Sequence, residues 1–235
     1  MTHFYVHSGP PIVELIGVTQ PIPAAIQRVM DHRDNVWNTD PIAGDPLALV
    51  EFGGRVCYES FDNKKNRSRL DYIKDTAINK DHGSIMEHAW FNFAVLELPR
   101  NALMELTRHR VGVAYSWRST RYVDNWVGYS IPPLFRDNSD LETQAIELAH
   151  QNFESYVLLK NLAAAYFPNE VRKHRVEAAR SILAGNCTTD GEFTCNLRSL
   201  RHIHKLRSDE GADAMMQEFA QALLDAAAPY TKGLL

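Results

Sequence analysis

Cationic side chains with a close spacing are the first residues of this sequence that suggest chemistry. The run Arg108–Arg110 reads Arg-His-Arg, and Ser119, Arg121 and Tyr122 follow shortly after it. Guanidinium groups bind phosphate oxygens through paired hydrogen bonds, so this concentration of arginines suits a phosphate or a pyrophosphate. The alternative interpretation of Arg108–Arg110 is a capped helix end, because cations are stabilised at a helix C-terminus.

A second cationic group lies near the C-terminus and comprises Arg180, Asn196, Arg198, Arg201, His202 and Arg207. On a helix, Arg198 and His202 share a face, whereas Arg198 and Arg207 point to opposite sides. One helix would then serve two pockets or two copies of a site, which predicts an oligomer with sites at subunit interfaces. A solvated basic helix is the alternative.

A third group could hold a metal ion, because it contains two histidines and a glutamate. Its members are His82, Ser84, Glu87 and His88. Two histidines six positions apart do not share a helical face, and the HExxH pattern is absent. We therefore expect no metal site here.

The elements that must position these groups can be read from periodicity. Residues 11–19 and 90–98 are rich in β-branched or aromatic residues and predict strands, whereas apolar residues at helical spacing predict a helix around 70–81. Pro99 suits the first turn of a helix that would end in Arg108–Arg110. Residues 111–122 are expected to form a loop.

Helices dominate the C-terminal half of the chain. Ser139 and Glu142 fit a capping box that opens a long helix. Pro168 marks the start of another helix, which would end near residues 183–185. Asn196 suits the N-cap of a helix that carries the second cationic group. We predict a helix-rich α+β fold in a single domain, residues 1–235, with a surface insertion at about 31–48.

Composition excludes several classes of protein. Of the 235 residues, 45% are hydrophobic and 23% are charged, which is typical of a globular protein. The net charge of -4 gives no overall basic surface for nucleic acid, so anion binding must come from local clusters. The odd number of cysteines and the lack of a long apolar run predict a cytoplasmic protein without a membrane span.

Together these segments resemble the flavin-dependent thymidylate synthase family. The family pattern is Arg-His-Arg, seven residues, a serine, and then Arg-Tyr; here one additional residue separates Arg110 from Ser119. His82–His88 resembles the family's H-x-[ST]-x-x-E-H segment, and Arg55–Cys57 resembles its A-R-V-[SC] segment. The downstream residues that match are Arg180, Asn186, Asn196, Arg198 and Arg207. This sequence departs from the family pattern at Ala184, where the family often has proline, and in the stretch 208–213.

The resemblance implies a helix-rich α+β fold around a central antiparallel sheet, and a homotetramer with sites shared between subunits. It implies that FAD takes a hydride from NADPH, and that a one-carbon unit from methylenetetrahydrofolate becomes a methyl group on C5 of dUMP. The implied cofactor contacts are Ser84, Glu87, Arg108, His109, Arg110, Asn196, Arg198 and His202. Those for the uridylate are Glu105, Arg108, Ser119, Arg121, Arg180 and Arg207. The resemblance gives catalytic roles to Arg207, as a cation that stabilises the anionic pyrimidine, and to His82, in proton transfer.

The additional residue suggests a narrower hypothesis. A longer loop beside the nucleotide would admit a ribose 2'-hydroxyl and make UMP a substrate beside or instead of dUMP.

The methylation that the resemblance implies needs no cysteine nucleophile. Cys57, Cys187 and Cys195 are therefore expected to be packed residues.

Two other functions use the same residues. One is a non-catalytic nucleotide- or RNA-binding module that stacks bases on Trp90, Trp117 and Tyr122. The other is a metal-dependent hydrolase built on His82, Glu87 and His88. The first predicts binding without flavin, and the second predicts stoichiometric metal.

Overall fold

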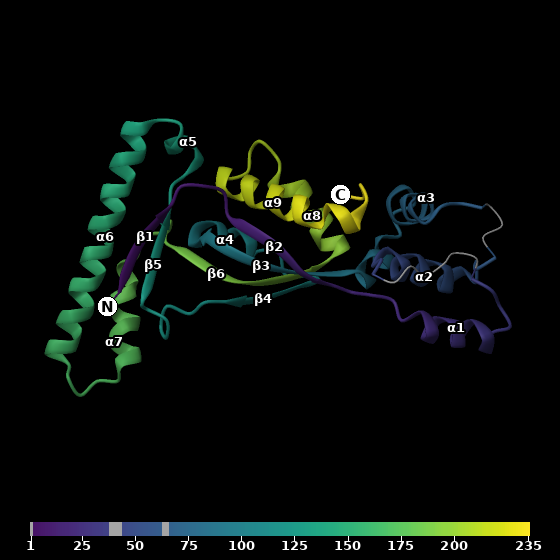
Figure 1. Cartoon of the computed structure of the whole chain (residues 1–235), viewed down its shortest axis with the longest axis horizontal. Helices are drawn as coiled ribbons and strands as arrows, with labels where there is room; N and C mark the ends of the chain where they lie inside the picture. The colour runs from purple at the N-terminus through teal and green to yellow at the C-terminus, as the bar shows by residue number, and fades with distance from the viewer. Residues whose placement is uncertain (1, 38–43, 63–65) are drawn as a thin grey trace.

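The chain forms three blocks in a row along its longest axis, as Figure 1 shows for a computed structural model that describes residues 2–37, 44–62 and 66–235. The strands are β1 (His3–His7), β2 (Ile12–Val18), β3 (Trp90–Pro99), β4 (Val113–Trp117), β5 (Trp126–Ser130) and β6 (Thr188–Asn196). The α-helices are α1 (Pro23–His32), α2 (Leu47–Tyr58), α3 (Arg69–Ile73), α4 (Arg100–Leu106), α5 (Pro133–Arg136), α6 (Ser139–Tyr166), α7 (Arg172–Ala179), α8 (Leu197–Arg207) and α9 (Ala214–Thr231). Three further helical segments are the wide-turned η1 (Lys74–Asn79) and the 3-10 turns η2 (Gly83–His88) and η3 (Arg180–Ile182).

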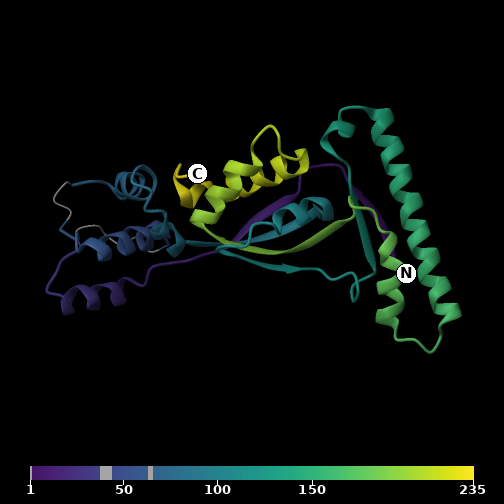
Figure 2. The same ribbon diagram turned by 180° about the vertical axis from the view of Figure 1, so that it is seen from behind.

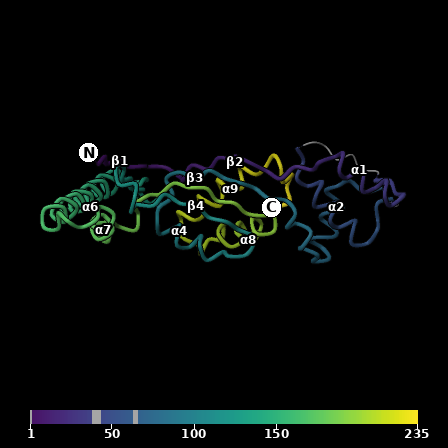
Figure 3. The backbone as a smooth tube through the Cα atoms, turned by 90° about the horizontal axis from the view of Figure 1, so that it is seen from below, coloured from purple at the N-terminus to yellow at the C-terminus, as the bar shows by residue number. Residues whose placement is uncertain are grey.

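An antiparallel sheet with strand order β2-β3-β6-β4 occupies the central block. Alternate residues of β3, namely Phe91, Phe93 and Val95, are fully buried and face the main core. Helices α4, α8 and α9 cover that face (Figure 3). On the other face, Asn92 of β3 donates a hydrogen bond to the hydroxyl of Thr194 on β6. The predicted α+β fold with a central antiparallel sheet is confirmed.

The two outer blocks have cores of their own. In one, β1 and β5 pair in parallel beside the long helix α6 and the shorter α7 (Figure 2). Tyr129 and Tyr156 are buried there. In the other, α1 and α2 enclose Met30 and Phe61.

Several helices begin or end at other residues than the sequence predicts. The long helix begins at Ser139, and Asn138 rather than Ser139 is its N-cap, because the Asn138 side chain accepts hydrogen bonds from two backbone amides of the first turn. The helix predicted from Pro168 begins only at Arg172, since Val171 still has an extended backbone. The helix predicted around 70–81 is split into α3 and η1.

Residues 111–122 were expected to be a loop, and this was wrong for Val113–Trp117. These residues form β4, which pairs with β6 in a continuous register from Val113 opposite Cys195 to Trp117 opposite Gly191. Strand pairing with a distant segment stabilises this conformation, and the strand-favouring residues Val113, Tyr115 and Trp117 were the local sign of it.

The surface insertion predicted at 31–48 overlaps the end of α1 and the start of α2, and its residues 38–43 lie outside the described residues. The assignment of a single domain stays a prediction. Among the described residues, every helix is too short or too polar to cross a membrane.

Candidate active site

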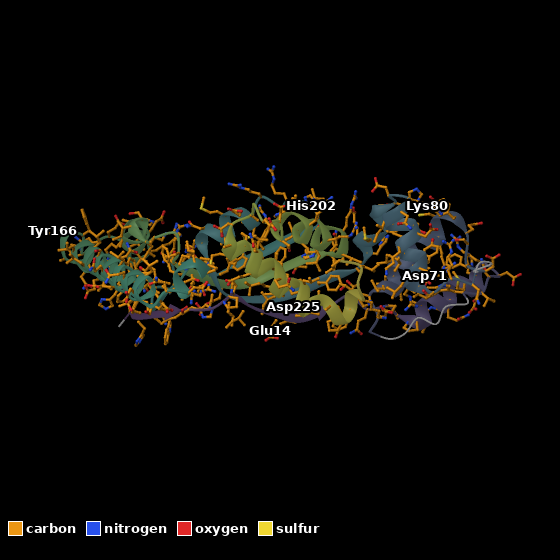
Figure 4. The ribbon with its side chains drawn as sticks, turned by 90° about the horizontal axis from the view of Figure 1, so that it is seen from above. Glu14, Asp71, Lys80, Tyr166, His202 and Asp225 are labelled. Carbon is orange, nitrogen blue, oxygen red and sulfur yellow. The ribbon has the colours of Figure 1, made fainter. Side chains whose placement is uncertain are left out.

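A cavity of about 330 Å³ opens on one side of the central block, where three segments that are far apart in the sequence meet. They are the end of η2, the turn after α4, and the first half of α8. Its lining residues are Glu87, Arg108, His109, Arg110, Val111, Arg198, Ser199 and His202. His202 projects from α8 in the central block (Figure 4). The cavity has three arginines and one carboxylate, so it suits an anionic ligand.

The run Arg108–Arg110 lies beyond the end of α4 rather than on it, contrary to the predicted helix end. The helix ends at Leu106, and the amides of Arg108 and His109 make only short-range bonds back to Glu105 and Leu106. Pro99 is the N-cap of α4 instead of a first-turn residue. Leaving the helix frees consecutive side chains to turn toward one cavity, which a helical spacing of 100° per residue would prevent.

The turn after Arg110 is docked on the N-terminus of α8. The carbonyl of Gly112 accepts a hydrogen bond from the amide of Asn196 at 3.0 Å, and the Ser199 hydroxyl donates to the carbonyl of Val111 at 2.7 Å. Gly112 has a φ of 65°, which favours glycine, and a Cβ there would lie 2.3 Å from Asn196 Nδ2. The turn therefore approaches α8 closely because residue 112 has no side chain.

Asn196 has a capping role, as predicted. Its Oδ1 accepts a hydrogen bond from the amide of Ser199 at 2.9 Å and closes the first turn of α8. One asparagine thus fixes both the helix that carries Arg198 and His202 and the turn that follows Arg110.

His109 lies at the centre of a buried polar cluster. Arg207 Nε donates to His109 Nε2 at 3.1 Å, and the same guanidinium donates to Glu105 Oε2 at 2.5 Å. The ring of His202 lies edge-on to that of His109, with centroids 5.7 Å apart. Burial, then the electrostatic influence of Arg207 and His202, lowers the pKa of His109 from 6.5 to about 4. His109 is therefore neutral at pH 7, with Nε2 as the acceptor and its proton on Nδ1.

Tyr115 supports the same cluster from the sheet. Its hydroxyl lies within hydrogen-bonding distance of the carbonyls of Leu106 and His109, at 2.9 and 2.5 Å. Burial raises its pKa to about 12, so the hydroxyl keeps its proton and remains a donor. Through Tyr115, strand β4 thereby fixes the backbone on which Arg108–Arg110 lie.

Arg198 forms an ion pair with Glu87 at 2.6 Å across the cavity. Both side chains are substantially exposed, at 54% and 41%. Exposed pairs of this kind contribute little, ~0–1 kcal/mol, to stability, so a ligand phosphate can replace Glu87 at low cost.

The remaining residues assigned to the uridylate lie elsewhere in the chain. Arg121 pairs with Glu177 of α7 at 2.8 Å, and Arg180 of η3 donates to the Thr120 hydroxyl at 2.9 Å. These contacts belong to the block of α6 and α7, whereas Glu105 and Arg207 belong to the central block. Within one chain, the predicted substrate residues are thus divided between the two ends of β4.

The segment between Arg110 and Ser119, which holds the additional residue, is partly a strand. The β4–β6 ladder has no register shift, and the amide of Arg118 continues it by donating to the carbonyl of Asp190 at 2.9 Å. Val111 and Gly112 precede the strand, and Val111 lines the cavity. The hypothesis that a longer loop beside the nucleotide admits a ribose 2'-hydroxyl stays a prediction.

His82 and Ser84 do not line the cavity. His82 Nδ1 lies 2.9 Å from the Tyr58 hydroxyl, and the two rings are stacked. Because Glu87 faces Arg198 and the ring of His88 lies against Gly53, the three residues of the hydrolase hypothesis have separate surroundings. Within residues 2–37, 44–62 and 66–235, three potential metal ligands do not gather anywhere.

The segment Arg55–Cys57 also lies apart from the cavity. Arg55 is 2% exposed and forms a buried ion pair with Glu51 at 2.7 Å. Cys187 and Cys195 are buried, which raises the pKa of both thiols, while Cys57 is exposed.

Two lining residues, Val111 and Ser199, were not predicted. Ser199 lies one position after Arg198 and three before His202, so helical spacing could have included it. Val111 adjoins Arg110, but its apolar side chain gave no chemical signal.

The sequence is similar to one known protein family and to several proteins that bear its name. The profile of the family described as thymidylate synthase complementing protein matches residues 42–230. A flavin-dependent thymidylate synthase of Mycobacterium tuberculosis H37Rv is 34% identical over 197 residues, which cover 80% of this chain and 76% of that protein. A probable flavin-dependent thymidylate synthase of Mycobacterium phage D29 is 37% identical over 206 residues, covering 81% of this chain and 85% of that protein.

Solved structures share the fold. Thymidylate synthase X from Helicobacter pylori, crystallised with FAD and dUMP, superposes with a TM-score of 0.61 at 22% identity, over 95% of this chain and 96% of that one. The UMP/dUMP methylase PolB from Streptomyces cacaoi, crystallised with 5-Br UMP, gives a TM-score of 0.65 at 20% identity, over 97% and 93% of the two chains.

Proposed function

The chain belongs to the flavin-dependent thymidylate synthase family, a family of methyltransferase-type enzymes, and we propose that it methylates C5 of a uridine 5'-monophosphate, dUMP or UMP. FAD is the cofactor, methylenetetrahydrofolate is the one-carbon donor and NADPH is the reductant. The observation that carries this proposal is the cationic cavity. Of the residues assigned to the flavin, it brings together Glu87, Arg108, His109, Arg110, Arg198 and His202.

The chemistry of the cavity fits FAD. A dinucleotide pyrophosphate needs several convergent donors, and this chain has no glycine-rich GxGxxG loop to supply them from the backbone. Arg108, Arg110 and Arg198 supply guanidinium groups instead. Ser84 and Asn196 complete the proposed set from beside the cavity. When bound, FAD carries the hydride between NADPH and the one-carbon unit.

Arg207 and Glu105 define where the pyrimidine is held. The Arg207 guanidinium is only 14% exposed and already has two fixed partners, Glu105 and His109. A cation held in this way stabilises negative charge that develops on a pyrimidine carbonyl without having to reorganise. Neutral His109 accepts a hydrogen bond from Arg207 and keeps the guanidinium oriented. Proton transfer by His82 is part of the proposal, since its ring is exposed beside Tyr58.

The uridylate phosphate is assigned to Ser119, Arg121 and Arg180, with Arg108 reaching the nucleotide from the cavity. Because these residues lie at the opposite end of β4 from Arg207, a complete site needs residues from a second subunit. A homotetramer with shared sites satisfies this need.

The exposed apolar residues of α6 support such an assembly. Leu148, Leu158 and Tyr166 are 63%, 58% and 76% exposed, and a helix rarely leaves so many large apolar side chains in water. Mixing Arg121→Ala with Arg207→Ala subunits tests the shared site. Recovery of activity in the mixed oligomer supports it, and two variants that stay inactive when mixed speak against it.

Flavin binding is the first test of the function. We expect purified protein to bind FAD, and its absorption bands to shift on addition of dUMP or UMP. Arg110→Ala should weaken FAD binding about tenfold or more, because it removes one charge-assisted contact. Arg28→Ala, which removes an exposed arginine of α1, is the matched control and should bind FAD normally. A protein that cannot be loaded with FAD would overturn the proposal.

The preferred sugar is decided by comparing kcat/KM for UMP and dUMP. Because one additional residue separates Arg110 from Ser119, we expect UMP to be turned over beside or instead of dUMP, and a strong preference for dUMP would refute this expectation. A pocket that is not built to exclude a hydroxyl at the 2'-position discriminates only weakly against one there.

A further inference from the structure

Glu97 has a strained backbone near the C-terminal end of β3. Its φ is 61°, a left-handed conformation that is rare for any residue other than glycine, and the pairing with β6 shifts register between Val95 and Leu98. Such strain is maintained only where the surrounding structure enforces it, and it concentrates at functional sites. Here the bulge directs the amide of Glu97 at Asp190 Oδ1, 3.1 Å away.

Asp190 also holds Arg118. Its Oδ2 lies 3.0 Å from Arg118 Nη1, and its backbone carbonyl accepts the amide of Arg118. The hydroxyl of Thr189 lies 3.4 Å from the carbonyl of Arg118. The two side chains of the ion pair are only 19% and 26% exposed, so solvent screens the pair less than it would a surface pair.

Arg118 is the last residue before the turn that carries the proposed phosphate contacts. The carbonyl of Ser119 accepts the amides of Tyr122 and Val123 at 3.1 and 2.9 Å, so the turn is compact. Its direction is therefore set by how Arg118 leaves β4. Asp190 fixes that exit from one side, while the contacts of Arg121 and Thr120 with the α7 block fix the turn from the other.

We infer that Asp190 is a positioning residue for nucleotide binding, which acts through Arg118 on Ser119 and Arg121 and does not touch the nucleotide itself. The inference rests on the proposed function, since it takes Ser119 and Arg121 as contacts of the uridylate. It goes beyond that function by assigning a role to an acidic residue that lies outside both groups of proposed ligands.

Replacing Asp190 by asparagine tests the role with little change of shape. In Asp190→Asn the amide oxygen can still accept from Glu97, whereas its NH2 group faces the guanidinium of Arg118 and the attraction is lost. We expect KM for the uridylate to rise about tenfold, the size typical of a lost hydrogen bond between charged groups. FAD affinity and kcat should stay within about twofold, because the cavity lies at the other end of β4. The urea midpoint of unfolding should fall modestly, because the ion pair is also lost from the folded state.

Asp225→Asn is the matched control. Asp225 is on α9 in the central block (Figure 4), and its Oδ1 accepts a hydrogen bond from Gln221, so the same chemical change is made outside the turn. It should leave KM, kcat and FAD binding unchanged.

A double-mutant cycle with Arg118→Gln separates positioning from general damage. If Asp190 acts through Arg118, the double variant should raise KM no more than either single variant does, and Arg118→Lys should recover part of the loss. An unchanged KM in Asp190→Asn, or a parallel loss of FAD binding and stability, would overturn the inference while leaving the proposed function intact. A wild-type protein that binds FAD but turns over neither uridylate would instead refute the proposed function and the inference together.

Discussion

Replacing Gly112 by alanine is the sharpest test of how the cavity is built. Two effects combine in Gly112→Ala. An L-residue at a φ of 65° costs about 1–2 kcal/mol, and a Cβ at 2.3 Å from Asn196 Nδ2 and 2.5 Å from Ser199 Oγ must displace both side chains. Losing the cap that Asn196 gives to α8 costs about 1 kcal/mol more. The free energy of unfolding should therefore fall by about 2–3 kcal/mol.

Gly233→Ala supplies the matched control. Gly233 has a φ of 78°, but nothing lies within 4 Å of the position of its Cβ. It should lose only the conformational part, about 1–2 kcal/mol. The difference between the two variants isolates the contact of the turn with α8.

The assay is urea unfolding of both variants, followed by FAD titration. Gly112→Ala should also bind FAD more weakly, because the turn carries Arg110 and Val111 into the cavity. Equal losses of stability in the two variants, together with normal FAD binding in Gly112→Ala, would show that the docking of this turn on α8 does not shape the site.

Three further predictions concern charge and thiols. Arg207→Ala should keep FAD but lose turnover by about two to three orders of magnitude, as when one fixed electrostatic contact to the transition state is removed, and near-normal kcat would exclude Arg207 from the mechanism. Because the pKa of His109 is lowered to about 4, the unfolded chain binds a proton that the folded protein does not as pH falls from about 6.5 toward 4. The free energy of unfolding should thus be highest above pH 6.5 and decrease as the pH falls below it. In urea titrations at several pH values, His109→Gln should make that decrease smaller. The same decrease in the variant and the wild type would contradict the lowered pKa. Replacing Cys57, Cys187 and Cys195 by alanine should leave methylation detectable, although the two buried sites lower the unfolding midpoint; a folded, flavin-loaded variant without any activity would contradict this.

The sequence by itself determined the residues whose signals are local. Asn196 followed by a periodic apolar pattern predicted a capped helix, and that helix presents Arg198 and His202 on one face, as their spacing required. The run Arg108–Arg110 was recognised because guanidinium chemistry depends on residue type and proximity in the chain. These features depend on contacts within one or two helical turns, which a sequence displays directly.

Only the tertiary structure decided which of these groups meet. Strand β4 pairs with β6, a distant segment of the chain, and although Val113, Tyr115 and Trp117 favour a strand, their local pattern does not identify its partner. That strand sends Arg121 to the block of α6 and α7 and leaves Arg108–Arg110 in the central block. Likewise, the burial of Arg55 against Glu51 and the left-handed bulge at Glu97 result from packing between distant segments. Long-range pairing therefore set the geometry of the site, while the sequence alone set its chemistry.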